Sequence, residues 1–233
     1  MHKRLVFIVL ATLLLPTIIQ LTAVEQYGFF LGGIAKILIH IGIPFLCIWY
    51  FRRHHPQFKV TTAILPPTKR AFAQSLKLAA VFGVGGAIAI YGSYVVLGPY
   101  VDFSSVIRSL SDNASVTASV FPYVALWVVL VNPFMEEFFW RGFVFGTLHT
   151  LARSTFQRSL VLFGTGIAFA IHHTIIITDW FNWWQYLLVV SFLAVVGIIF
   201  NWMRLKTSSI LAPLIIHTIA DLVIVLIGFS IFY

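Results

Sequence analysis

The chain has 233 residues, of which 60% are hydrophobic and 9% are charged. A protein of this size has too little interior to hide so much apolar surface, so a water-soluble fold is excluded and a membrane protein is predicted. The formal net charge of +8 falls mostly between apolar runs, where it suits contact with the anionic headgroups of membrane lipids. We expect no nucleic-acid partner from this charge.

Seven apolar runs are long enough to cross a bilayer, which takes about 20 helical residues. Backbone groups in lipid must be paired within their own segment, and the runs lack the alternation of barrel strands, so each is expected to be a helix. The sequence therefore predicts an all-α, polytopic transmembrane helix bundle. The predicted spans lie near residues 5–24, 28–51, 76–98, 117–148, 158–178, 184–203 and 208–232.

Basic residues concentrate in alternate loops, and this distribution predicts the orientation. The exceptions among them are Lys36, Arg108 and Arg141. By the positive-inside rule, the N-terminus is cytoplasmic and the C-terminus lies outside. We expect one membrane domain over residues 1–233, with the N-terminal spans in 1–100, and a multi-pass protein of a plasma membrane, of prokaryotic type.

Ionisable side chains are rare within the predicted spans, and each is costly at that depth, so each is by default a candidate for function. They are Lys36, His40, Glu136, Glu137, Arg141, His172, His173, His217 and Asp221. Residues four positions apart share a face of a helix. Three pairs with this spacing occur in three different spans: Glu137 with Arg141, Phe169 with His173, and His217 with Asp221.

The adjacent glutamates in FMEEFFWRG, residues 134–142, have different predicted roles. Glu137 precedes Arg141 at the favourable spacing for an ion pair, which we interpret as structural. One residue along a helix is a rotation of about 100°, so Glu136 points elsewhere and we expect its partner on the histidine helices. The Asn-Pro pair at 132–133 resembles an N-cap followed by proline, which predicts that the long fourth span kinks or restarts there.

A glutamate, two histidines and an aspartate are side chains that activate water for hydrolysis, with or without a metal. The candidate set is Glu136, His173, His217 and Asp221. Three interpretations of Asp221 stay open: it binds a metal, orients the His217 ring, or accepts a hydrogen bond as a buried carboxylate. Such residues also build proton relays in transporters, but the absence of inverted repeats disfavours that class.

The three pairs resemble the motifs of the CPBP family of intramembrane proteases, which includes CAAX prenyl endopeptidases and bacteriocin-processing or abortive-infection proteins. The family's motifs are EExxxR, FxxxH and HxxxN or HxxxD. This chain has EEFFWR at 136–141, FAIHH at 169–173 and HTIAD at 217–221, in the same order. The resemblance covers roughly residues 117–225, the expected catalytic core, and implies an endopeptidase acting on a membrane-associated or prenylated peptide.

The resemblance also implies roles for the candidate residues. Glu136 with His173 would activate a water that attacks a peptide carbonyl, and His217 with Asp221 would stabilise the oxyanion or bind a metal. The predicted ion pair would hold the glutamate helix in place. Two departures matter. The last motif residue in the family is commonly Asn, which donates a hydrogen bond, whereas an ionised Asp221 cannot. Members of the family resemble an eight-helix arrangement, whereas this sequence predicts seven spans.

Charge leaves the cofactor open. Three carboxylates (Glu136, Glu137, Asp221) against one guanidinium (Arg141) give a formal site charge of −2 when the histidines are neutral. A divalent metal such as zinc, held by the four candidate residues, would balance that charge, and so would protonated carboxylates. A metalloprotease and a glutamate-dependent protease are both compatible with the sequence. The alternative class is a catalytically silent scaffold or bacteriocin-immunity protein.

Depth in the membrane sets a further expectation. Glu136 and His217 lie towards the cytoplasmic ends of their predicted spans, whereas His173 lies nearer the outer end of the span at 158–178. Bringing the three together requires that span to be tilted or to begin nearer Thr165.

Overall fold

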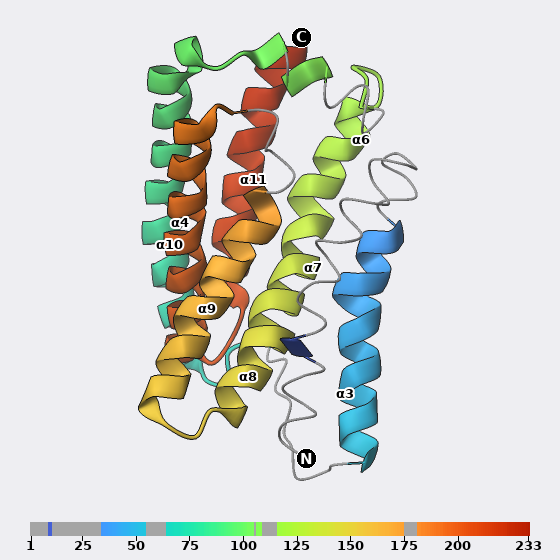
Figure 1. Ribbon diagram of the computed structural model, residues 1–233, viewed down its shortest axis with the longest axis vertical. Coiled ribbons are helices and arrows are strands. Elements are labelled where there is room, and N and C mark those ends of the chain that lie inside the picture. The colour runs from blue at the N-terminus through green and yellow to red at the C-terminus, as the bar shows by residue number, and fades with distance from the viewer. Residues whose placement is uncertain (1–8, 11–33, 55–63, 105, 109–115, 175–180) are drawn as a thin grey trace.

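The computed structural model describes residues 9–10, 34–54, 64–104, 106–108, 116–174 and 181–233. Within these ranges all regular structure is helical, as predicted. Figure 1 shows the long helices lying side by side along the long axis of the molecule, which forms a bundle. The span predicted at 5–24 falls almost wholly outside the described residues.

The helical segments overlap the other six predicted spans. Three segments, Lys69–Tyr100, Trp183–Thr207 and Leu211–Ile231, are long and apolar enough to cross a membrane. The main elements are η2 (Leu38–Gly42), α3 (Ile43–His54), α4 (Lys69–Leu97), α6 (Phe121–Leu126), η4 (Trp127–Val131), α7 (Asn132–Glu137), η5 (Phe138–Phe145), α8 (Gly146–Leu151), α9 (Thr155–Thr174), α10 (Trp183–Thr207) and α11 (Leu211–Phe232).

The glutamates lie in a single long helical run, from Phe121 to Leu151, that includes two π-helical stretches, η4 and η5. Of the predicted kink or restart at Asn132, the restart is wrong, because this residue has helical angles (φ −57°, ψ −49°) and Val131 before it makes no side-chain cap. The widened turn of η4 accommodates Pro133, which lacks the N–H needed in a regular helix interior. The Asn132 side chain is consequently available for another partner.

The two histidine-bearing helices, α9 and α11, are positioned around α10. Figure 1 shows α9 inclined to α10 and α11. Gly166 of α9 and Gly197 of α10 let the two backbones touch, since a Cβ on Gly197 would lie 2.6 Å from the Gly166 carbonyl oxygen. Ser208 has left-handed backbone angles (φ 53°) and ends α10, so the chain reverses into α11.

The core gathers around the glutamate helix. Phe139, Trp140 and Phe143 of η5 are buried and pack with Phe169 of α9. Burial of these aromatic side chains stabilises the contact of η5 with α9 and keeps water scarce around the charged residues beside them. Residues 135–145 are therefore the longest continuously buried stretch of the described chain.

Candidate active site

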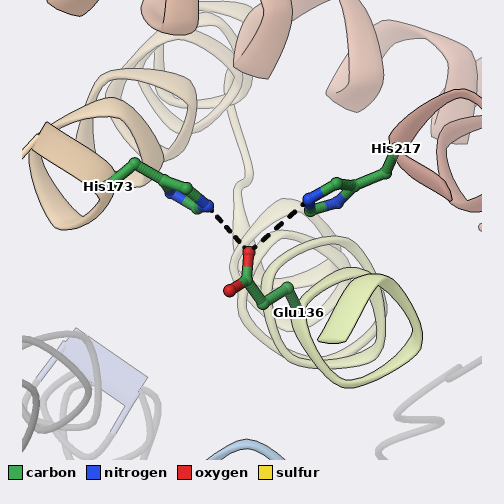
Figure 2. Close-up of side chains that lie close together, drawn as sticks. All are labelled: Glu136, His173 and His217. Carbon is green, nitrogen blue, oxygen red and sulfur yellow. Dashed lines mark hydrogen bonds and ion pairs between the residues drawn. The ribbon is translucent and has the colours of Figure 1, made fainter. Parts of the chain in front are cut away.

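Glu136 is the point at which three helices meet. Its carboxylate, on α7, is only 2% exposed. Oε2 lies 2.8 Å from Nε2 of His173 on α9 and 3.8 Å from Nε2 of His217 on α11. Figure 2 shows the two imidazole rings pointing at this oxygen from opposite sides. The expectation that Glu136 faces the histidine helices is confirmed.

The other oxygen of Glu136 has a partner from the N-terminal part of the chain. Nζ of Lys36 lies 2.7 Å from Oε1, across 100 positions of sequence. Lys36 belongs to a helical segment that the structure describes from Ile34 onwards and that continues through η2 into α3. Sequence reasoning identified Lys36 as an ionisable residue within a span but gave it no partner. Its only signal was its isolation in an apolar run.

Glu137 forms the predicted ion pair and a second bond that was not predicted. Nη1 of Arg141 donates to Glu137 Oε1 at 2.9 Å, and both side chains are fully buried. The same oxygen lies 2.8 Å from Nδ1 of His217. The Arg141 guanidinium also covers the ring of Phe169, with Cζ 3.9 Å from the centroid. Glu137 therefore connects the ion pair to the histidine of α11.

In His173 and His217, the hydrogen bond made by Nδ1 determines the role that Nε2 can have towards Glu136. Nδ1 of His173 lies 2.9 Å from the carbonyl oxygen of Phe169. A carbonyl only accepts, so this nitrogen carries a hydrogen. Nδ1 of His217 faces the carboxylate of Glu137, which also accepts. In both rings Nε2 is the nitrogen presented to Glu136, either as a lone pair or, in the imidazolium, as a donor.

Asp221 lies at the edge of this group. Its Oδ1 is 3.7 Å from Nε2 of His217, too long for a hydrogen bond, and its Oδ2 accepts from Nδ2 of Asn132 at 3.4 Å. One of the three interpretations was that Asp221 orients the His217 ring by a hydrogen bond. In the structure Glu137 makes that bond instead. Asn132, expected to be a helix cap, is instead the partner of Asp221.

A comparison with known families agrees with the geometry. Residues 118–223 match the family model of the Rce1-like type II CAAX prenyl endopeptidases. The match contains all three motifs and confirms the expected resemblance. It supports a CAAX-type intramembrane protease. No curated protein and no solved structure matches the chain.

The Rce1-like segment also contains a set of metal-ligating atoms. Ligand atoms of Glu136, His173 and His217 lie within 4.8 Å of one another. Two imidazoles and a carboxylate are a known ligand set of catalytic zinc, and metal-bound histidines usually donate their other N–H to an oxygen, as both do here. The residues thus fit a divalent ion. Asp221 stands outside this group, and its part in the predicted four-residue ligand set stays a prediction.

Lys36 changes the charge at the site. The three carboxylates contribute −3, and Arg141 with Lys36 contributes +2, which leaves −1 in place of the −2 expected from the sequence. One further positive charge within this group would neutralise the remaining charge. A divalent ion is therefore compatible with the ligands but is not required for charge balance.

Proposed function

We propose that this protein is an intramembrane endopeptidase that hydrolyses a peptide bond of a membrane-associated or lipidated peptide by means of water activated at Glu136. The observation that carries the proposal is the convergence of two imidazole nitrogens on one buried carboxylate oxygen (Figure 2). A carboxylate held in this way has the geometry of a general base. The Rce1-like match supports the reaction class.

In the proposed reaction, Oε2 of Glu136 removes a proton from a water molecule while the water oxygen bonds to the peptide carbonyl carbon. The carbonyl oxygen takes up the electron pair of its π bond and becomes an oxyanion. Collapse of this intermediate breaks the C–N bond, and the proton held by Glu136 passes to the departing amine nitrogen. The carboxylate is restored at the end of the cycle, as a general acid–base catalyst requires.

The histidines have separate proposed roles. His173 fixes Oε2 by the 2.8 Å contact, and its ring is held by the Phe169 carbonyl. His217 presents Nε2 beside the same oxygen and, when that nitrogen carries a proton, donates to the developing oxyanion. Glu137 then stabilises the charge on the His217 ring through its bond to Nδ1.

A divalent metal, if bound, would be held by Glu136, His173 and His217 and would supply Lewis-acid polarisation of the carbonyl. The proposed substrate class follows the family: a peptide whose C-terminal region carries a prenyl group. A farnesylated CAAX peptide in liposomes is accordingly the first substrate to test.

The test uses wild type, Glu136→Ala and His173→Ala on that peptide, each with and without a chelator. We expect both substitutions to lower kcat by about 100-fold or more, because each removes part of the proton-transfer group. Cleavage that persists in both variants would contradict the assignment of this site as the protease active site. Activity that resists the chelator but is lost in Glu136→Ala supports the metal-free route, and loss on chelation with recovery on added zinc supports the metal.

A further inference from the structure

We propose that Lys36 is a positioning residue for Glu136, supplied by an N-terminal helix that lies outside the matched segment 118–223. The inference rests on the proposed role of Glu136 as the base. It adds a component of the active site that none of the three motifs contains. The protease site is then built from four helices, of which the matched segment supplies three.

The contact between Lys36 and Glu136 is short and asymmetric in burial. Nζ lies 2.7 Å from Oε1, within the range of charge-assisted hydrogen bonds. The lysine side chain is 18% exposed and the glutamate 2%. A buried carboxylate needs a compensating charge, and Lys36 is the one ammonium within ion-pair distance of it among the described residues.

Aromatic and imidazole rings pack the helix that carries Lys36 against the glutamate helix. His40, one turn further along, is buried, and its ring centroid lies 5.1 Å from that of Phe139 and 5.9 Å from that of His172. Phe45 stacks on Phe138 at 5.5 Å. These contacts fix the rotation of the helix, so its lysine faces Glu136 instead of lipid.

The backbone around Lys36 is part of the same arrangement. Nδ1 of His40 donates to the carbonyl oxygen of Lys36 at 3.0 Å. The π-helical turn η2 follows directly, over Leu38–Gly42, and contacts both α7 and η5. π-helical turns widen a helix locally and re-aim its side chains. The turn and the hydrogen bond together support the position of the ammonium group.

The two oxygens of Glu136 therefore have different tasks. Oε1 is held by Lys36, whereas Oε2 faces the two histidines, where the water and the scissile carbonyl would lie. Without the ammonium group, the carboxylate can rotate about its Cγ–Cδ bond and the alignment of Oε2 is lost. Because Lys36 acts on the base and not on the substrate, we expect the effect in kcat and not in KM.

The experiment compares Lys36→Met, Lys36→Arg and Lys36→Ala with wild type, as purified full-length protein in liposomes, on the farnesylated CAAX peptide. We expect Lys36→Met to lower kcat by roughly 10- to 100-fold, the size of effect seen when a catalytic group is slightly misplaced. KM should stay within about threefold, since no substrate contact is removed. Lys36→Arg should recover part of kcat, because the cation returns.

Rescue of kcat by a small amine distinguishes a positioning role of Lys36 from a purely structural one. Added ethylammonium should raise the kcat of Lys36→Ala, and tetramethylammonium, which has no N–H donor, should not. Lys77→Met is the matched control, because Lys77 is an exposed lysine on the apolar helix α4. It should leave kcat unchanged.

The outcomes separate this inference from the function on which it rests. If wild type cleaves and Glu136→Ala does not, the proposed function stands. Wild-type kcat in Lys36→Met then overturns the positioning role alone. A loss of activity that neither Lys36→Arg nor ethylammonium recovers also overturns the positioning role. A loss of activity accompanied by loss of the thermal unfolding transition does the same, because either result makes Lys36 merely structural.

Discussion

The two faces of the glutamate helix differ in their access to solvent. The open face consists of Glu136 with its partners Lys36 and His173, whose side chains are 18% and 22% exposed. The closed face consists of Glu137 and Arg141, which are both fully buried. His217 touches both faces, through Nδ1 to Glu137 and through Nε2 towards Glu136. Two adjacent and chemically identical side chains therefore experience different surroundings.

The difference indicates how one helix supports both folding and chemistry. A base must exchange protons with water and substrate, which requires a partner set that is partly open, as around Glu136. An ion pair with no exposed atoms cannot exchange in that way, but it can fix a helix and a histidine ring. The comparison predicts that substitutions on the closed face lower stability and that substitutions on the open face lower kcat.

Glu137→Gln gives the largest expected effect on stability. It leaves the Arg141 guanidinium buried without a counter-charge and weakens the bond to His217. Breaking one partner of a buried pair costs about 3–5 kcal/mol of the free energy of unfolding. Unfolding in mixed detergent micelles would measure the change.

Glu136→Gln is the matched control for that measurement. It should lower stability by much less, because the Lys36 side chain is partly exposed and a glutamine oxygen can still accept a hydrogen bond from its ammonium group. Equal destabilisation by the two substitutions would remove the distinction between the faces. The double variant Glu137→Gln with Arg141→Met should recover much of the loss, since no unpaired charge remains.

Local helix geometry accounts for what could be predicted from the sequence. The spacing of four between Glu137 and Arg141, and the rotation that separates Glu136 from them, are properties of any helix and are confirmed. The helical class followed from the composition and from long apolar runs that lack the alternation of barrel strands. The seven-span topology and its orientation stay predictions, since three segments of the described chain satisfy the length and hydropathy of a span.

Contacts between distant helices could not be predicted in the same way. No periodicity relates Lys36 to Glu136, because their contact depends on how the helix at 34–54 is rotated against α7. The role of Asn132 was mistaken because a π-helical turn, which has no clear sequence signal, keeps the helix continuous through Pro133. The bond from His217 to Glu137 likewise depends on the placement of α11.

Gly197→Ala tests whether the frame around the open face is as tightly fixed as the comparison assumes. The new methyl group would lie 2.6 Å from the Gly166 carbonyl oxygen, so α9 must move away from α10. Overpacking of this kind costs about 1–3 kcal/mol. Because His173 lies two turns beyond Gly166 on α9, kcat should fall along with stability.

Gly85→Ala is the control for Gly197→Ala. It makes the same substitution in a helix, but no atom lies within 4 Å of the added methyl group. Its stability should equal or slightly exceed that of wild type, because alanine favours a helix more than glycine does. A Gly197→Ala protein that is as stable and active as Gly85→Ala would contradict the close contact of α9 with α10.

Asp221→Asn has the smallest expected effect and bears on the boundary between the two faces. Neither oxygen of Asp221 makes a hydrogen bond that requires its negative charge: the 3.7 Å contact with His217 is long, and an amide oxygen can still accept from Asn132. We expect kcat within about tenfold of wild type, since a long contact contributes little positioning. The new amide can also donate towards an oxyanion, which offsets part of any loss. A loss as large as that in Glu136→Ala, together with reduced bound zinc by elemental analysis, would instead make Asp221 a metal ligand and extend the candidate ligand set beyond the three residues on which it now rests.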